Sequence, residues 1–243
     1  MTLAGREREL EKIIRNLRRG VDTLVFGTAG VGKTAILLEA AARLGTVGAE
    51  GLCGAVYVAD CSRRRRLLEG VFEGLIQDAG TSRSSRPSTP PGRRRPLLYN
   101  GLRELVFARS RGKVIYLLLD HLPGVNRRME HLLELLEQHF TVACAVTAMP
   151  GAYDLYFWKY DRVEVGDLPR NDALPWIESQ LAGMGYGTRL SEEIAREVCR
   201  LGRGNPRTIS DTLRAIASQV VPLDDPIRVR RMFVAGLWSS LGE

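Results

Sequence analysis

The segment from Gly27 to Thr34 has the clearest chemical signal in the sequence. It matches the pattern G-x-x-x-x-G-K-[ST], whose glycines let backbone N–H groups turn inward around phosphate oxygens at the start of a helix. Lys33 would reach the β- and γ-phosphates, and Thr34 would offer its hydroxyl to Mg²⁺. A glycine-rich turn with an incidental lysine is disfavoured by the strand-loop-helix context. The octet predicts a site for ATP or GTP with Mg²⁺, formed by Gly27, Thr28, Ala29, Gly30, Val31, Gly32, Lys33 and Thr34.

Asp120 is the candidate for the acidic group that completes the magnesium site. Such a residue is expected at the end of a buried strand later in the chain, and Asp120 closes the apolar run VIYLLLD at 114–120. An aspartate that only caps a helix or forms a turn is the alternative. The run of apolar residues before Asp120 favours the magnesium-holding role.

His121 occupies the position where many ATPases of this layout have a glutamate that activates the attacking water. A neutral imidazole could orient water but suits this role less well, which predicts slow or partner-stimulated hydrolysis. A plain surface histidine is an equally open interpretation. Asp60 is the next candidate for a general base.

These residues need a sheet and helices to position them. Apolar runs predict strands at 23–26, 55–60, 114–120, 142–148 and 162–165, with helices at 5–20, 35–44, 67–79, 97–109 and 126–139. Strands that are apolar throughout indicate a parallel sheet covered on both faces. Later segments are all helical, at about 171–183, 191–201, 206–220 and 226–240. We predict an α/β core over 1–168, with a five-stranded parallel sheet flanked by helices, and a small all-helical lid over 169–243.

The composition is that of an ordinary globular protein. The 243 residues are 44% apolar and 26% charged, which excludes wholesale disorder and a fibrous protein. No apolar window approaches about eighteen residues and the start of the chain is acidic and polar, so we expect no membrane span, no secretory signal and a cytoplasmic location. The four cysteines lack metal-site spacing, so we expect neither a disulfide nor zinc.

Positive charge is concentrated in one part of the chain. Between Cys61 and Arg95 there are nine arginines and three acidic residues, a balance of +6 in a chain of net charge +7. Clustered arginine is typical of proteins that bind a phosphate backbone, although a charge run is more often a solvated surface. Residues 81–96 are rich in Ser, Pro and Arg and predict a basic loop. The candidate DNA-binding residues are Arg63, Arg64, Arg65, Arg66, Arg93, Arg94 and Arg95.

Several segments together resemble the AAA+ superfamily of P-loop ATPases. They are GRERELEKI at 5–13, the phosphate loop, LLLDH at 117–121, a polar residue at 147 that ends a strand, and RGNPRTI at 203–209. The sequence is most similar to the branch that contains initiator ATPases, STAND-type signalling ATPases and transposition-helper ATPases. The resemblance covers about residues 3–220.

The resemblance implies roles for further residues. Gly5 and Arg6 would line the adenine pocket, and Thr147 would sense the γ-phosphate or the water, as the residue called sensor 1. Arg207 would reach the nucleotide from the lid, as the residue called sensor 2. A surface arginine at the start of a helix is the alternative for Arg207. His121 is the departure that most puts family-like hydrolysis in question.

An assembly of this kind also needs an arginine that acts on the nucleotide of a neighbouring subunit. Arg162 lies where the family often keeps such a residue, and its competitors are Lys159, Arg127 and Arg128.

The aromatic cluster Tyr153, Tyr156, Phe157, Trp158 and Tyr160 could stack on a base or a partner. We interpret it as packing between core and lid.

Three functions compete for this sequence. The first is an ATP-binding AAA+ protein that forms a homo-oligomeric ring or filament with nucleotide, binds duplex DNA without sequence preference, and works with a further protein partner, as a transposition-helper ATPase does. The second is a STAND-like assembly switch without nucleic acid. The third is a P-loop small-molecule kinase, which the helical tail disfavours. We favour the first, with slow ATP hydrolysis.

Overall fold

The described residues form two units in this computed structural model. They are 5–45, 53–77, 114–146, 155–183, 192–218, 226–227, 229–231 and 234. The sheet unit consists of Arg8–Gly27 and Lys33–Val165, and the helical unit consists of Met1–Glu7, Thr28–Gly32 and Gly166–Glu243. Most of the phosphate loop thus groups with the helices. Outside the described residues lie the helix predicted at 97–109, the basic loop with Arg93, Arg94 and Arg95, and Thr147.

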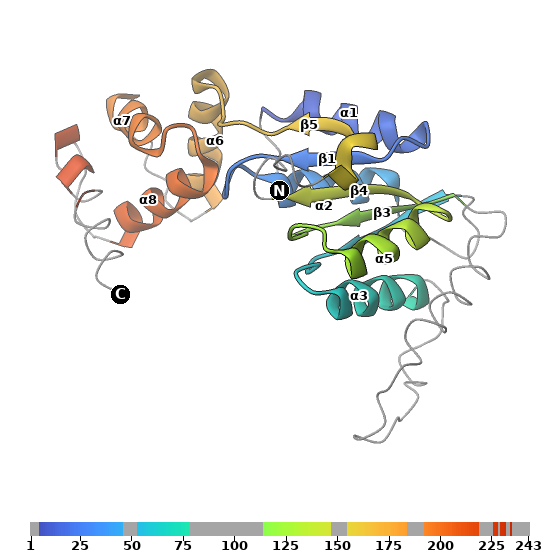
Figure 1. The fold of residues 1–243 in the computed structure, drawn as a ribbon. Coiled ribbons are helices and arrows are strands. Elements are labelled where there is room, and N and C mark those ends of the chain that lie inside the picture. Colours follow the sequence, from blue (N-terminus) through green and yellow to red (C-terminus); the bar gives the residue numbers. More distant parts are fainter. Residues whose placement is uncertain are drawn as a thin grey trace. The chain divides into compact units, whose positions relative to one another are not determined.

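A five-stranded parallel sheet forms the centre of the sheet unit (Figure 1). Its order is β2-β3-β4-β1-β5, so β1 has β4 on one side and β5 on the other. The predicted parallel sheet is confirmed. Strand ends differ from the prediction by up to two residues, which leaves Asp60 beyond the end of its strand. The bounds are β1 Thr23–Phe26, β2 Cys53–Val58, β3 Val114–Leu119, β4 Thr141–Val146 and β5 Asp161–Glu164.

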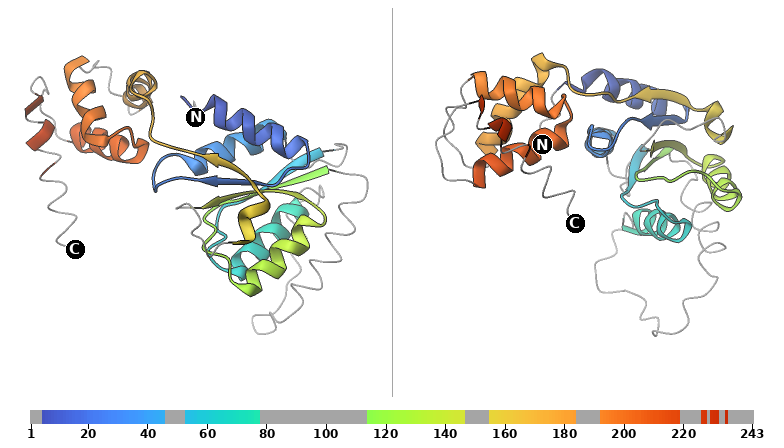
Figure 2. Two further views of the ribbon diagram at one scale, coloured as in Figure 1. Left: turned by 45° about the horizontal axis from the view of Figure 1, so that its top comes forward. Right: turned by 60° about the vertical axis from the view of Figure 1, so that its left-hand side comes forward.

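Helices cover both faces of this sheet. Figure 2 shows α1 (Glu7–Arg18) and α2 (Lys33–Leu44) on one face, and α3 (Arg64–Gln77) and α5 (Arg127–Glu137) on the other. Helix α3 approaches β2 closely because it has glycine where the two elements meet. A Cβ at Gly70 would lie 2.4 Å from Cγ1 of Val58, and one at Gly74 would lie 2.3 Å from Cγ1 of Val56.

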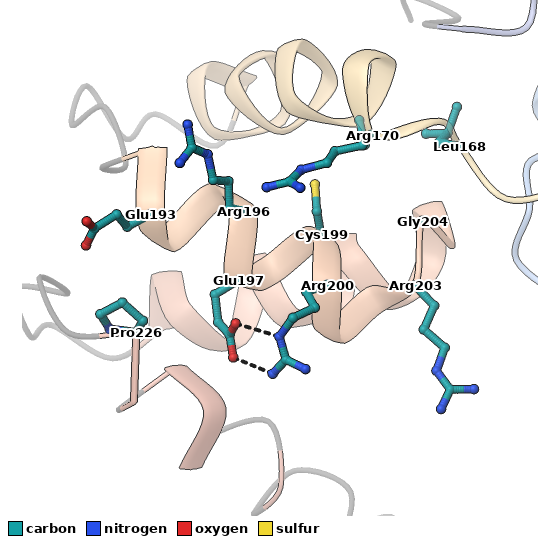
Figure 3. A pocket seen from close by; sticks show the side chains of 11 residues that line it. Leu168, Arg170, Glu193, Arg196, Glu197, Cys199, Arg200, Arg203, Gly204 and Pro226 are labelled. Carbon is teal, nitrogen blue, oxygen red and sulfur yellow. Dashed lines mark hydrogen bonds and ion pairs between the residues drawn. The ribbon is translucent and has the colours of Figure 1, made fainter.

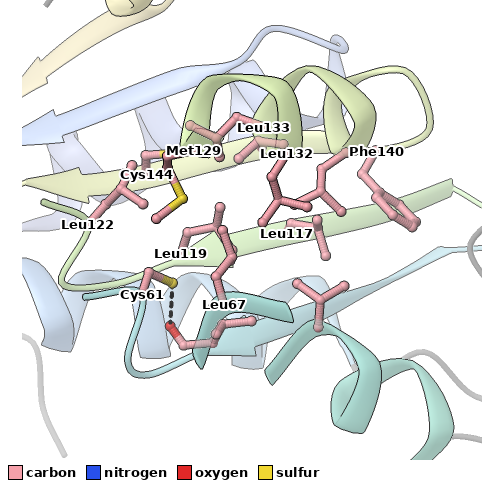
Figure 4. Close-up of a cluster of buried hydrophobic side chains, with 14 of the residues drawn as sticks. Cys61, Leu67, Leu117, Leu119, Leu122, Met129, Leu132, Leu133, Phe140 and Cys144 are labelled. Carbon is pink, nitrogen blue, oxygen red and sulfur yellow. Dashed lines mark hydrogen bonds between the residues drawn. The ribbon is translucent and has the colours of Figure 1, made fainter. Parts of the chain in front are cut away.

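The main hydrophobic core lies between the sheet and the α3–α5 layer (Figure 4). Leu117 and Leu119 of β3 meet Leu67 of α3 and Leu132 of α5, and all four are fully buried. Each such side chain contributes about 1.5–3 kcal/mol through its removal from water. This core fixes the position of β3, and therefore of Asp120 at the carboxyl end of that strand.

The aromatic segment differs from the prediction that placed it between core and lid. Tyr153 lies outside the described residues, and Leu155–Lys159 form a short 3-10 helix, η1, between β4 and β5 in the chain. Phe157 and Tyr160 belong to the core of the sheet unit, where the Tyr160 hydroxyl donates a hydrogen bond to Glu137. Trp158 is 75% exposed. Sequence pattern alone could not separate these environments, because a 3-10 turn places consecutive aromatic residues on different sides.

The helical unit contains α6 (Arg170–Gly183), α7 (Glu192–Gly202) and α8 (Pro206–Ser218). Their core includes Ile177, Ile194, Val198, Ile209 and Leu213. Of the helix predicted at 226–240, the structure describes helical residues at 226–227, 229–231 and 234. None of the helices in the described ranges is long and apolar enough to cross a membrane.

Candidate nucleotide site

The phosphate loop joins the end of β1 to the start of α2. Two of its glycines have backbone conformations that residues with side chains rarely adopt, with φ +85° at Gly30 and +104° at Gly32. Gly32 thus has the conformational role that the sequence pattern assigns to its glycines, and Gly30 has a similar conformation at a position that the pattern leaves open. Lys33 and Thr34 then begin α2, so the loop is followed by a helix N-terminus, as predicted.

Lys33 is held at the beginning of this loop. Its Nζ donates a 2.7 Å hydrogen bond to the carbonyl oxygen of Gly27. Burial lowers the pKa of the Lys33 ammonium, and the nearby Asp120 carboxylate opposes that shift. Lys33 and Asp120 therefore lie close enough in the sheet unit to interact electrostatically, as a phosphate-binding lysine and a magnesium-holding acid should.

Asp120 follows β3 directly and is only 2% exposed. Its Oδ1 accepts a hydrogen bond from the backbone N–H of His121 at 2.8 Å, and its Oδ2 accepts one from the Tyr57 hydroxyl at 3.0 Å. Burial raises the pKa of the Tyr57 phenol, and so does the Asp120 carboxylate. Tyr57 therefore remains a donor at neutral pH.

The role of Tyr57 was missed in the sequence. The only signal was a tyrosine one residue before the end of an otherwise apolar strand, β2, which pairs with β3.

His121 has an unusual backbone and a defined tautomer. Its φ of +53° is in the left-handed region, which is uncommon for a residue with a side chain. The ring Nδ1 lies 3.0 Å from the carbonyl oxygen of Ala59, and the side chain is 62% exposed. A carbonyl oxygen only accepts hydrogen bonds, so the neutral ring has its proton on Nδ1 and a free lone pair on Nε2. Nε2 is the atom that can accept a proton from water.

Asp60, the other candidate base, is exposed beyond the end of β2. Its Oδ1 accepts a hydrogen bond from the backbone N–H of Ser62 at 3.0 Å, and its Oδ2 lies 4.0 Å from Nε of Arg66. Hydrogen bonding from Ser62 lowers the pKa of this carboxyl group, which makes it a weaker base.

Within the helical unit, the loop segment Thr28–Gly32 is contacted by Arg6, from the GRERELEKI motif, and by Asn205, from the RGNPRTI motif. The buried Arg6 guanidinium donates to the carbonyl oxygens of Val31, at 3.1 Å, and Gly166. Asn205 donates from Nδ2 to the carbonyl oxygen of Ala29 at 2.9 Å. Gly5, next to Arg6, has φ +68°, and a Cβ there would lie 2.6 Å from Cβ of Asp172.

Asn205 is a residue whose importance was missed in the sequence. Its Oδ1 accepts from the backbone N–H of Arg207 and Thr208, so the same side chain caps α8 and holds the loop. The backbone N–H of Arg207 also donates to the carbonyl oxygen of Gly30 at 3.2 Å. The Arg207 guanidinium is exposed and lies 3.9 Å from Asp211.

The remaining candidate residues are on the surface. Arg63, Arg64, Arg65 and Arg66 are exposed around the first turn of α3, which begins three residues before the predicted helix. Arg65 pairs with Glu69 at 2.8 Å. Arg162 lies inside the edge strand β5, and its side chain is exposed.

Comparison with solved structures shows which known proteins have a similar fold. No protein-family model and no curated protein matches the sequence. Among solved structures, the ORC2 protein of Aeropyrum pernix, solved as ADPNP–ADP complexes, is 15% identical with a TM-score of 0.62, covering 97% of this chain and 69% of that chain. A Walker-type ATPase of Pyrococcus abyssi is 13% identical with a TM-score of 0.59, covering 97% and 75%. PCH-2 of C. elegans is 11% identical with a TM-score of 0.57, covering 97% and 68%.

These likenesses concern the fold alone. The five-stranded parallel sheet flanked by helices is the AAA+ fold of P-loop NTPases, so the predicted fold class is confirmed.

Proposed function

We propose that this protein binds ATP with Mg²⁺ at the phosphate loop and is a slow or partner-stimulated ATPase. The observation that supports this most directly is the geometry of the loop before α2, where Gly30 and Gly32 have positive φ and Lys33 is held against the Gly27 carbonyl, together with the buried Asp120 directly after β3. In this proposal Lys33 neutralises the phosphates, while Thr34 and Asp120 hold the magnesium ion. Gly5 and Arg6 lie on the adenine side, Thr147 and Arg207 respond to the γ-phosphate, and His121 orients the attacking water.

We further propose that nucleotide brings subunits together into a ring or filament that binds duplex DNA without sequence preference, as an accessory to a partner protein such as a transposase. Support comes from Arg63, Arg64, Arg65 and Arg66 at the start of α3. Cations at a helix N-terminus oppose the helix dipole at a cost of about 0.3–1 kcal/mol each, and a bound phosphate would remove that repulsion. Arg93, Arg94 and Arg95, which lie outside the described residues, are further candidates for contacts with DNA, and Arg162 would act on a neighbouring subunit's nucleotide.

The test measures both parts in one set of samples. Labelled ATP is titrated into the wild-type chain, Lys33→Ala and the control Lys12→Ala, which removes a lysine from an exposed ion pair with Asp161 at 3.0 Å. Lys33→Ala should abolish ATP binding and Lys12→Ala should leave it unchanged, since exposed pairs contribute about 0–1 kcal/mol. Unchanged ATP affinity in a folded Lys33→Ala protein would overturn the nucleotide site.

The DNA arm uses anisotropy of labelled duplex DNA across a salt series, with and without an ATP analogue. Monomers should bind with Kd of about 10⁻⁴ to 10⁻⁶ M, and the assembled form should bind more tightly and with a steeper salt dependence. Absence of binding even at low salt would discard the DNA role and favour the signalling switch.

A further inference from the structure

A pocket of about 580 Å³ lies inside the helical unit. Its walls come from the start of α6, the length of α7 and the turn that follows α7 (Figure 3). The backbone N–H of Leu168 donates to the carbonyl oxygen of Gly204 at 2.8 Å, which joins the first and last of these walls. A volume of this size is within the range of about 300–1,000 Å³ that is typical of ligand sites.

Guanidinium groups dominate the polar part of the lining. Arg170, Arg196, Arg200 and Arg203 all line the pocket, and two glutamates, Glu193 and Glu197, accompany them. Figure 3 shows Arg170 extending from α6 toward Cys199 of α7. The Arg170 charge acts to lower the pKa of the Cys199 thiol, although burial has the larger effect and raises it.

Two of these arginines are available for a ligand. Arg200 is engaged by Glu197, at 2.6 Å, and Arg196 is engaged by Glu192. Within the described ranges, Arg170 and Arg203 have no acidic partner, and Glu197 is already shared with Arg230 at 3.0 Å. Like charges gathered around a concave space are stabilised by an anion that enters it.

The rest of the lining is apolar. Leu168, Ala173 and Cys199 are buried residues on the pocket wall, and Pro226 completes it. Because Leu168, Ala173 and Cys199 are at most 7% exposed, a ligand would meet mainly the arginine side chains, whose methylene stems supply the apolar contact. A single inorganic phosphate would leave most of the volume empty.

We propose that this pocket binds an acidic peptide segment of a partner protein, whose carboxylates pair with Arg170 and Arg203. Planar guanidinium groups match carboxylates in a bidentate geometry, and apolar side chains of the peptide would pack on the methylene stems of the arginines. Duplex DNA fits less well, because a stiff double helix cannot enter a pocket of about 580 Å³, whereas a single peptide segment can. None of the residues proposed to bind nucleotide lines this pocket, so the partner site goes beyond the proposed function.

The test uses a fluorescein-labelled peptide of alternating Glu and Leu, and the same peptide with Gln for every Glu. Titrations compare the wild-type chain with Arg170→Gln/Arg203→Gln and with the charge-matched control Arg15→Gln/Arg18→Gln, whose exposed arginines lie on α1. Melting temperature and labelled-ATP affinity are measured on every variant. Unchanged values establish that the fold and the nucleotide site are intact, whatever the peptide does.

The Glu peptide should bind the wild type and the control equally, and the pocket variant at least about tenfold more weakly, because charge-assisted pairs are among the stronger polar contacts. The Gln peptide should bind no better to the wild type than to the pocket variant. Equal losses of affinity for the Glu peptide in both double variants would show that only the net charge of the protein matters, and this would overturn the proposal. So would displacement of the peptide by duplex DNA or by free glutarate at equal concentrations of charged groups, which would make the site one for nucleic acid or for a small molecule.

Discussion

The hydroxyl of Tyr57 donates a hydrogen bond to Oδ2 of Asp120 across the neighbouring parallel strands β2 and β3, at 3.0 Å. The other carboxylate oxygen is occupied by the backbone N–H of His121. These two donors, together with the Nδ1 atom of His121 that lies 3.4 Å from Oδ2, fix the orientation of this buried carboxylate before any ligand binds. Oδ1 keeps a second lone pair with which it can hold a hydrated metal ion.

Tyr57→Phe should lower the apparent magnesium affinity in nucleotide binding by about 5- to 30-fold, because one neutral hydrogen bond to a charged group is worth about 1–2 kcal/mol. Magnesium is titrated at a fixed concentration of ATP analogue. The matched control is Tyr116→Phe, a buried tyrosine of β3 for which the described residues offer no hydroxyl partner. A magnesium titration of Tyr57→Phe that overlays the wild-type curve would remove Tyr57 from the site.

Replacing His121 should change the chemical step and leave nucleotide affinity intact. If Nε2 is the proton acceptor, His121→Gln should slow single-turnover hydrolysis by about 10²-fold or more, and His121→Glu should raise it above the wild-type rate. Rapid-quench measurements with labelled ATP decide between these outcomes. Wild-type turnover in His121→Gln would mean that another group activates water, and Asp60→Asn would then be the variant to examine.

Asn205 has two separable functions. Asn205→Ala removes both the cap of α8 and the bond to Ala29, and should cost about 0.5–2 kcal/mol of stability. Asn205→Asp keeps an oxygen that can accept from Arg207 and Thr208 but cannot donate to the Ala29 carbonyl. It should retain the melting temperature yet bind ATP more weakly than the wild type. Equal ATP affinity in the wild type and Asn205→Asp would show that the contact with the loop has no part in binding.

The ion pairs of Glu197 should give a pH-dependent contribution to stability. Hydrogen bonds from Arg200 lower the pKa of this carboxyl to about 2 from its ordinary 4.5. A lowered carboxyl pKa stabilises the fold fully above pH 4.5, and the stabilisation is lost as the pH falls toward 2. Glu197→Gln should be less stable by about 1–3 kcal/mol near neutrality.

The difference in unfolding free energy between the wild type and Glu197→Gln therefore depends on pH. Urea unfolding at decreasing pH should bring the two stability curves together in the acid range. Glu193→Gln is the control on the same helix, and its curve should stay parallel to that of the wild type. A constant gap between wild type and Glu197→Gln at every pH would contradict the assignment.

The parts of the site that depend on local sequence were predictable, and the parts that depend on register between distant segments were not. The loop from Gly27 to Thr34 is fixed by glycine and lysine spacing, and Asp120 by the apolar strand before it. The bond between Tyr57 and Asp120 depends on how β2 pairs with β3, and residues 63 apart in the chain leave no periodic signal of that pairing. The hydrogen bond between Asn205 and Ala29 joins residues 176 positions apart, so it also leaves no signal in the local sequence.

The crowded surroundings of Gly30 couple the residue type at this position to that at position 205, far away in the sequence. The general phosphate-loop pattern leaves this position open to any amino acid. Here a Cβ would meet Oδ1 of Asn205 and Cβ of Arg207, each at 2.7 Å, on a backbone already at φ +85°. A homologous protein that has asparagine at position 205 should therefore also have glycine at position 30. Among homologues, a residue other than glycine at position 30 should therefore occur only where position 205 has also changed, whereas position 205 can change alone.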